Sequence, residues 1–359
     1  MKKILALALC LCMVLCVVAC GEKAPEGPEA KDYKLGMGIV VDMSESATGT
    51  AQVDATVAAV VTDADGKIVS CRIDVAQNKM TVADGAVDTA AEFQTKMEKG
   101  DAYGMAAALG YGMDWNGDGV VKEWYDQAKA FESYVTGKTV SEVEAIATKE
   151  VEGKGYIIPA DDALLSAGCT IQVTDFIEAV AKACKDEQGM SFTTAQTFTL
   201  GVAAKTTAAD STAATAEAEG EVKMYTDFAA SVVADGKILA SLNDAIQPVI
   251  KVTAAGEVAP QEFKGTKREL KDAYGMAPAV GYGMDWNGDG KVLEWYLQSL
   301  EFSKFVVGKT AADVEAMATK EVEGKGYIIS ADDALLSAGC TIQITSIKAV
   351  VAQSVTNAR

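Results

Sequence analysis

The chain has 359 residues, of which 49% are hydrophobic, so it is long enough for one to three domains with packed cores. Asp and Glu number 51 against 32 Lys and Arg, and the net charge of −19 argues against nucleic acid and anionic lipid headgroups as partners. The sequence contains no His, which excludes Ser-His-Asp and Cys-His catalysis and His-ligated zinc or haem.

The chain opens with the pattern of a secretory signal. Lys2 and Lys3 precede an uncharged apolar run at 4–19, which is too short and wrongly flanked for a membrane span. The sequence Val-Val-Ala-Cys that ends at Cys20 resembles the lipobox of bacterial lipoproteins. The resemblance implies that residues 1–19 are a signal peptide and that Cys20 carries a diacylglycerol, which anchors an exported protein to the outer face of the cell membrane. An ordinary secretory signal cut elsewhere is the alternative.

Residues 20–33 are rich in Pro, Glu and Lys and are typical of a tether between the lipidated Cys and a folded body. Loss of Lys2 and Lys3 with the signal leaves 30 basic against 51 acidic residues, a mature charge of −21. A lipid anchor thus provides the expected contact with the membrane, and the acidic body remains in water above it.

Two long segments occur twice at an offset of 171 residues. They are DAYGMAAALGYGMDWNGDGVVKEW (101–124, again at 272–295) and ATKEVEGKGYIIPADDALLSAGCTIQVT (147–174, again at 318–345). So long a period indicates a duplicated domain and not a solenoid repeat. We expect repeat 1 at 34–185 and repeat 2 at 194–357, joined by a polar linker at 185–192. The Ala- and Thr-rich stretch 204–221 is expected to be a mobile loop.

Each repeat is expected to begin with strands and to end with helices. Apolar residues alternate over 53–59, and Asp65-Gly66 before the next strand predicts a hairpin turn. Helical spacing predicts helices over 124–135 and 139–148. A last helix is expected to start with Asp175 as its N-cap, and with Ser346 in repeat 2. The expected fold class is α+β, with two tandem copies of a small domain in which an antiparallel sheet is followed by helices.

This pattern resembles the FMN-binding domain of exported bacterial redox lipoproteins. The resemblance rests on the DGKI hairpins, on the turns YVTGKT (134–139) and FVVGKT (305–310), and on the loop DALLSAGCTIQVT (162–174) with its second copy from Asp333. It implies FMN linked through its phosphate to Thr170 and Thr341, with Ser166 and Ser337 as further flavin-binding residues. This loop departs from the family pattern, because Ala and Gly are reversed and Cys169 precedes the Thr. The alternative is that these loops are structural and start the last helix.

The repeated segment DWNGDG matches the first half of a calcium-binding loop. The candidate ligands are Asp114, Asn116, Asp118, Val120 (carbonyl) and Glu123 in repeat 1, and Asp285, Asn287, Asp289, Lys291 (carbonyl) and Glu294 in repeat 2. The second half departs from the pattern, because Tyr125 and Tyr296 stand where a bidentate acid belongs. The alternative is an Asx turn that starts the following helix.

Three functions remain open from the sequence. The first is a surface lipoprotein with tandem FMN-binding-like domains that binds flavin in extracellular electron transfer. The second is a non-enzymatic surface module stabilised by calcium, which binds a protein partner or a small ligand. The third is a solute-binding lipoprotein. No catalytic constellation is visible, and the four Cys beyond Cys20 form no C-x-x-C pair, so we favour a protein that is not an enzyme.

Overall fold

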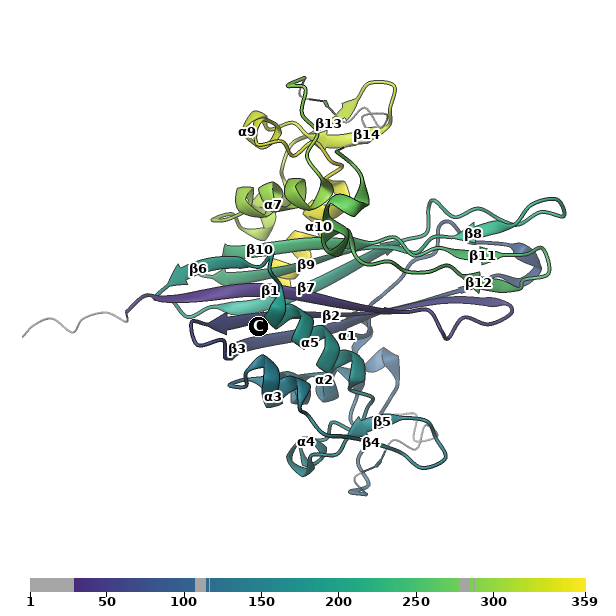
Figure 1. Cartoon of the computed structure of the whole chain (residues 1–359), viewed down its shortest axis with the longest axis vertical. Coiled ribbons are helices and arrows are strands. Elements are labelled where there is room, and N and C mark those ends of the chain that lie inside the picture. The colour runs from purple at the N-terminus through teal and green to yellow at the C-terminus, as the bar shows by residue number, and fades with distance from the viewer. Residues whose placement is uncertain (1–28, 107–113, 116, 278–284, 287) are drawn as a thin grey trace, which may run out of the picture.

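The computed structural model describes residues 29–106, 114–115, 117–277, 285–286 and 288–359, so the predicted signal peptide and Cys20 lie outside the described residues. Two antiparallel sheets lie in the middle, with helices on their outer sides (Figure 1). The first sheet has the spatial order β3 (Ile68–Thr81), β2 (Thr50–Asp63), β1 (Lys31–Asp42), β6 (Met190–Thr194). The second has the order β10 (Lys237–Ile246), β9 (Tyr225–Ala234), β7 (Thr199–Thr207).

The remaining elements follow in the same order in both repeats. In repeat 1 they are α1 (Lys96–Lys99), α2 (Trp124–Val135), α3 (Val140–Glu144), β4 (Thr148–Glu150), β5 (Ile157–Pro159), α4 (Asp162–Ser166) and α5 (Thr174–Lys185). In repeat 2 they are α6 (Lys267–Leu270), α7 (Trp295–Phe305), α8 (Ala311–Glu315), β13 (Thr319–Val322), β14 (Tyr327–Ser330), α9 (Asp333–Ser337) and α10 (Thr345–Thr356). Repeat 2 adds a small sheet of β12 (Val258–Pro260), β11 (Ile250–Val252) and β8 (Gly220–Val222). The predicted combination of antiparallel sheets and helices is therefore confirmed.

The predicted hairpins are present in both repeats. Between β2 and β3, Gly66 has a φ of +74°, and its N–H donates to Asp63 O over 3.0 Å. Between β9 and β10, Asp235 and Gly236 have φ values of +49° and +73°. Positive φ at both central residues gives a turn whose twist matches that of the flanking strands.

The alternation of apolar residues along the strands supplies two kinds of core. Leu35, Val57 and Phe228 belong to a central cluster that gathers the inner faces of both sheets. Val60 and Ile73 belong to a second cluster, in which the outer face of the first sheet is covered by α2 and α5. A third cluster covers the outer face of the second sheet in the same way. The result is four layers, helix–sheet–sheet–helix (Figure 1).

The two sequence repeats share the central cluster, so the structure does not confirm two separate tandem domains. β3 lies beside β7, and β6 lies beside β10, so the edges of the two sheets meet. β6 begins inside the predicted linker and pairs with β1, where Met190 lies opposite Leu35. The linker therefore ends as a strand of the first sheet.

Two glycines allow the last helix of each repeat to lie directly on its sheet. A Cβ at Gly36 would lie 2.0 Å from the carbonyl oxygen of Ala183 on α5. A Cβ at Gly201 would lie 1.9 Å from the carbonyl oxygen of Ser354 on α10. Any larger residue at these positions would push the helix away from the sheet.

Three local predictions are corrected. The helix expected over 139–148 is limited to α3 at 140–144, and Thr148 already begins β4. Asp175 is not an N-cap, because Ile177 N–H already donates to Val173 O, and α5 starts two residues earlier than expected. Ser346 is displaced in the same way within α10, whose N-cap is Ile344.

The stretch 204–221 is held in place at three points instead of forming a mobile loop. It starts inside β7 and ends inside β8. Between these strands, Ala214 N–H donates to Gly85 O in repeat 1. The stretch therefore connects the small sheet of repeat 2 to repeat 1.

Candidate functional site

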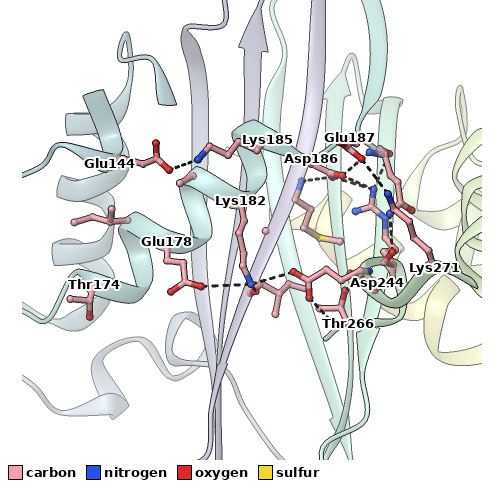
Figure 2. Close-up of a pocket in the computed structure, with 18 residues that line it drawn as sticks. Glu144, Thr174, Glu178, Lys182, Lys185, Asp186, Glu187, Asp244, Thr266 and Lys271 are labelled. Carbon is pink, nitrogen blue, oxygen red and sulfur yellow. Dashed lines mark hydrogen bonds and ion pairs between the residues drawn. The ribbon is translucent and has the colours of Figure 1, made fainter. Parts of the chain in front are cut away.

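A groove of about 530 Å³ separates α5 of repeat 1 from α6 of repeat 2, and β1 forms its floor (Figure 2). The ammonium group of Lys182 lies in this groove, 3.7 Å from Glu178 Oε1 and 3.2 Å from Glu269 Oε1. It also donates to Ile39 O over 3.0 Å. The other basic side chains are paired too: Lys185 with Glu144, Arg268 with Asp186, and Lys271 with Glu187. The charged side chains of the groove thus pair with one another and connect the two repeats, and we call this groove the seam.

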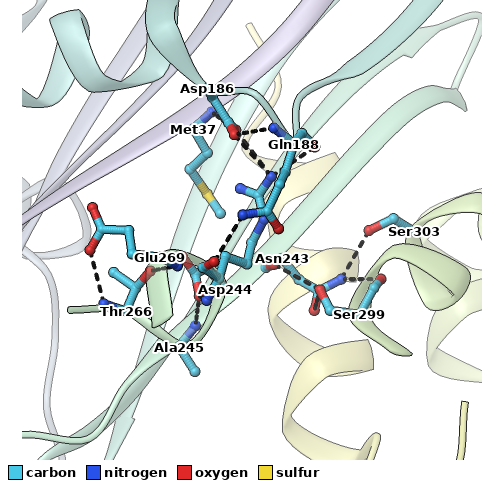
Figure 3. Close-up of polar contacts among 11 residues, drawn as sticks. Met37, Asp186, Gln188, Asn243, Asp244, Ala245, Thr266, Glu269, Ser299 and Ser303 are labelled. Carbon is cyan, nitrogen blue, oxygen red and sulfur yellow. Dashed lines mark hydrogen bonds and ion pairs between the residues drawn. The ribbon is translucent and has the colours of Figure 1, made fainter. Parts of the chain in front are cut away.

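Arg268 joins α6 to the linker across this seam, and its partners Asp186, Gln188 and Asp244 are labelled in Figure 3. Its Nη2 lies 3.1 Å from Asp186 Oδ2 and donates to Gln188 O over 2.8 Å, with both charged side chains largely buried. The backbone N–H of Arg268 donates to Asp244 Oδ1 over 3.0 Å. Burial raises the pKa of Asp244 to about 6, against the charge of Arg268, which lowers it. These contacts hold the linker between the repeats in one conformation.

The contact across the seam has a counterpart on the other side of the molecule. Gln353 and Glu98 lie one repeat away from Lys182 and Glu269, and Gln353 Nε2 donates to Glu98 Oε1 over 2.5 Å. Each repeat therefore uses the same two positions to contact the other, as the subunits of a two-fold dimer do.

The described residues among those predicted as site residues lie elsewhere, at the two ends of the long axis (Figure 1). We call tip 1 the described residues of 114–123 and 148–170, and tip 2 those of 285–294 and 319–341. Tip 1 contains α4 and the β4–β5 hairpin, and tip 2 contains α9 and the β13–β14 hairpin.

Thr170 and Thr341, the predicted FMN-bearing residues, are 2% and 1% exposed. The Thr170 hydroxyl donates to Gln127 Oε1 over 3.2 Å, and the Thr170 N–H donates to the same oxygen over 2.8 Å. Thr341 makes the same two bonds with Gln298. A phosphoester at either hydroxyl would require this turn to open.

Ser166 and Ser337 end α4 and α9 and are exposed. Gly168 and Gly339 follow two residues later with φ values of +86° and +91°, which favour glycine. Of the four predicted flavin-binding residues, the two serines are therefore the ones whose hydroxyls solvent can reach.

The DWNGDG loops fold through their own side chains. Asp114 accepts the N–H groups of Asp118 and Gly119 over 3.0 and 2.9 Å, and Asp118 accepts that of Val120 over 2.8 Å. In the second loop, Gly290 N–H donates to Asp285 over 3.0 Å, and Lys291 N–H donates to Asp289 over 2.8 Å. Asn116 and Asn287 lie outside the described residues.

Glu123 and Glu294 turn away from these loops. Glu123 is 8% exposed and accepts the N–H groups of Met105 and Ala106 over 2.9 and 3.0 Å. Glu294 makes the equivalent pair of bonds with the N–H groups at 276 and 277. No group of three or more acidic or Cys side chains within the described residues could hold a metal ion, so calcium binding stays a prediction.

Each tip carries an aromatic pair. Trp115 and Tyr156 have ring centroids 6.4 Å apart and are tilted by 38°, and Trp286 and Tyr327 are 6.1 Å apart at 35°. All four side chains are partly exposed, so each pair offers an aromatic surface to a ligand.

The tips diverged far less than the helices that pack on the sheets. The segment 101–124 matches 272–295 at 20 of 24 positions, and 147–174 matches 318–345 at 26 of 28. By contrast, α5 and α10 match at only 3 of 12 positions. Many identical tip residues are exposed, and substitutions at such positions change stability little. Their identity therefore indicates a function that both tips share.

Sequence reasoning missed Gln127 and Gln298, whose side chains hold the Thr170 and Thr341 turns. The sequence did contain a signal for these residues: Gln occupies the same position in α2 and α7, although most other residues of the two helices differ. The aromatic partners Tyr156 and Tyr327 were missed as well.

The chain is similar to a protein called chlorophenol reductase from Desulfitobacterium hafniense, with 31% identity over 179 residues. The match covers 44% of this chain and 51% of the relative, so the chain spans about half of that protein's length. No family model matches the sequence, and no solved structure matches it. Among the described residues, no helix is both long and apolar enough to cross a membrane.

Proposed function

We propose that this protein is a lipid-anchored surface lipoprotein whose two repeats each bind one flavin at the tip, for electron transfer outside the cell. The observation that carries the proposal is the near-identity of the two tips. Many of the identical residues are exposed, and the stability of the fold does not require exposed residues to be identical. The expected anchor is Cys20, 11 residues before β1 begins at Lys31.

Flavin is the ligand class that the tip chemistry supports best. An isoalloxazine ring can stack on the exposed edges of the partly buried Trp115–Tyr156 and Trp286–Tyr327 pairs. The exposed hydroxyls of Ser166 and Ser337 can donate hydrogen bonds to phosphate or ribityl oxygens. The buried Thr170 and Thr341 favour non-covalent binding over a phosphoester.

The redox role rests on the relative named as a reductase and on the resemblance to FMN-binding domains. A flavin supplies the electron-carrying group, while the chain holds it and sets the distance between two such groups. The four-layer body separates the tips, so each flavin would exchange electrons with its own partner.

The test is titration of FMN with the full-length lipoprotein in detergent, followed by flavin fluorescence. We expect quenching to saturate at two FMN per chain, and Trp115→Ala and Trp286→Ala each to remove one site. Val69→Ala, at a 36% exposed position outside the tips, is the control and should retain both sites. Unquenched fluorescence throughout the titration would overturn the proposal.

A further inference from the structure

The two tips differ at one position that contacts the Ser166 turn. Lys122 Nζ donates to Ala167 O over 2.7 Å, and its side chain covers Gly168, where an added Cβ would lie 2.6 Å from Lys122 Cε. In tip 2 this place is taken by Leu293, whose Cδ1 would lie 2.6 Å from a Cβ at Gly339. The residues from Ala160 to Gln172 are identical to those from 331 to 343, so the turn itself is the same in both tips.

The ammonium group of Lys122 is available to a ligand. Lys122 is exposed, and no carboxylate within the described residues forms an ion pair with it. Its bond to Ala167 O uses one of three N–H donors and holds the charge on the residue that follows the exposed Ser166. Leu293 offers no donor and no charge at the same place.

Tip 2 has a lysine of its own, but at a different place. Lys291 replaces Val120, two residues before Leu293, in the exposed DWNGDG loop. The tips therefore carry the same number of cations in this segment, and only tip 1 places one against the turn.

We infer that Lys122 is a specificity-determining residue that makes tip 1 selective for a ligand ending in a phosphate monoester, whereas tip 2 binds the ligand with or without phosphate. This inference rests on the proposed function. An ammonium group is a donor that phosphate binds well, because charged donors make the stronger hydrogen bonds, and Ser166 adds an exposed hydroxyl to the same turn. For flavins, tip 1 should prefer FMN to riboflavin and tip 2 should not.

The experiment titrates full-length lipoprotein with FMN and with riboflavin, using Trp286→Ala to leave tip 1 and Trp115→Ala to leave tip 2. In the first background we expect FMN to bind about fivefold more tightly than riboflavin, as befits one solvent-screened ion pair. In the second the two should bind equally. The preference at tip 1 should shrink as salt rises from 0.05 to 0.5 M.

The reciprocal exchange isolates the residue. Lys122→Leu should abolish the FMN preference of tip 1 and leave its riboflavin affinity unchanged, Lys122→Arg should keep the preference, and Leu293→Lys should create it in tip 2. Val120→Lys adds a charge to the DWNGDG loop of tip 1, at the position of Lys291 in tip 2. It is the matched control and should leave the FMN preference of tip 1 unchanged.

The outcomes separate the inference from the proposed function. Binding of neither flavin at either tip would overturn the proposed function and this inference with it. Binding of both flavins with the same preference at both tips, or an equal loss of both in Lys122→Leu, would overturn the inference alone. Equal melting temperatures of the variants would show that the changes are not effects on folding.

Discussion

Arg359, two residues beyond repeat 2, forms an ion pair with Glu132 on α2 of repeat 1. Its Nη2 lies 2.9 and 2.8 Å from the two carboxylate oxygens, and Glu132 is 4% exposed. Glu132 also accepts Ile73 N–H over 2.9 Å and lies 3.5 Å from Arg72 Nη1. A buried carboxylate of α2 is thus neutralised partly by the other repeat, so the repeats stabilise each other through charge as well as through apolar contact.

Replacing Arg359 with Ala should lower the free energy of unfolding by about 1–2 kcal/mol, because Glu132 then stays buried with only Arg72 nearby. The side chain of Arg359 is 35% exposed, so solvent reduces the effect. The measurement is urea unfolding of the full-length protein. Lys129→Ala breaks an exposed pair with Asp126 at 3.8 Å and should cost less than about 0.5 kcal/mol. Equal effects of the two variants would contradict this role of Arg359.

Local parts of the fold could be predicted from the sequence, because their causes are local. The Asp65-Gly66 turn, the alternation over 53–59 and the helical spacing from Trp124 each depend on neighbouring residues, and all three predictions are confirmed. The shared core could not be predicted, because the inner face of a strand gives no sign of which sheet will cover it. Met190 beside Leu35 is such a long-range pair.

The site was predicted in part for the same reason. The repeated loops located the tips, but spacing alone could not show which way a side chain turns. Glu123 stands close to the acidic loop in sequence and points instead to the N–H groups of Met105 and Ala106. Thr170 is buried because Gln127, 43 residues earlier, accepts its hydrogen bonds.

Stability should fall as the pH rises from 5 to 7.5. Burial raises the pKa of Asp74 to about 7 and that of Asp244 to about 6, against 3.8 in the unfolded chain. The folded state therefore holds protons that the unfolded state releases, and stability present below pH 4 is lost as the pH passes through 6 and 7. We expect a loss on the order of 1–3 kcal/mol per group, since both are almost fully buried.

Unfolding in urea at several pH values measures this loss. Asp74→Asn and Asp244→Asn should each flatten the pH dependence, because an amide does not titrate in this range. Val69→Ala, at an exposed position with no titratable group, is the control and should leave the slope unchanged. A stability that rises over this pH range would be incompatible with two buried carboxylic acids.

Calcium should have little effect on melting, whereas loss of Glu123 should have a large one. Asp114 and Asp118 already accept N–H groups of their own loop, and the Glu123 carboxylate holds two N–H groups elsewhere. Glu123→Ala should therefore destabilise the protein by about 2–4 kcal/mol, since two N–H groups lose a charged acceptor.

Melting curves with calcium chloride and with chelator test this prediction, alongside Glu123→Ala and Glu294→Ala. A calcium-dependent rise in the melting temperature that disappears in Asp118→Ala would instead support the calcium-stabilised module. The exposed acid Glu152 provides a control, because Glu152→Ala should change neither curve.

Thr170→Val and Ser166→Ala should have opposite consequences, because one hydroxyl is buried and the other exposed. Thr170→Val keeps the shape of the side chain and removes its bond to Gln127, so it should cost about 1–2 kcal/mol of stability. It should not lower the FMN content, since a non-covalently held flavin does not need this hydroxyl. Ser166→Ala should leave stability within about 0.5 kcal/mol and weaken FMN binding at tip 1.

The intact mass of the protein from its native cell separates non-covalent flavin binding from a covalent phosphoester. We expect acyl chains on Cys20 and no flavin phosphate on the chain. A mass increase of one or two FMN that is lost in Thr170→Val and Thr341→Val would show a covalent linkage. Such a linkage would mean that the buried turns open to a flavin transferase before the body closes.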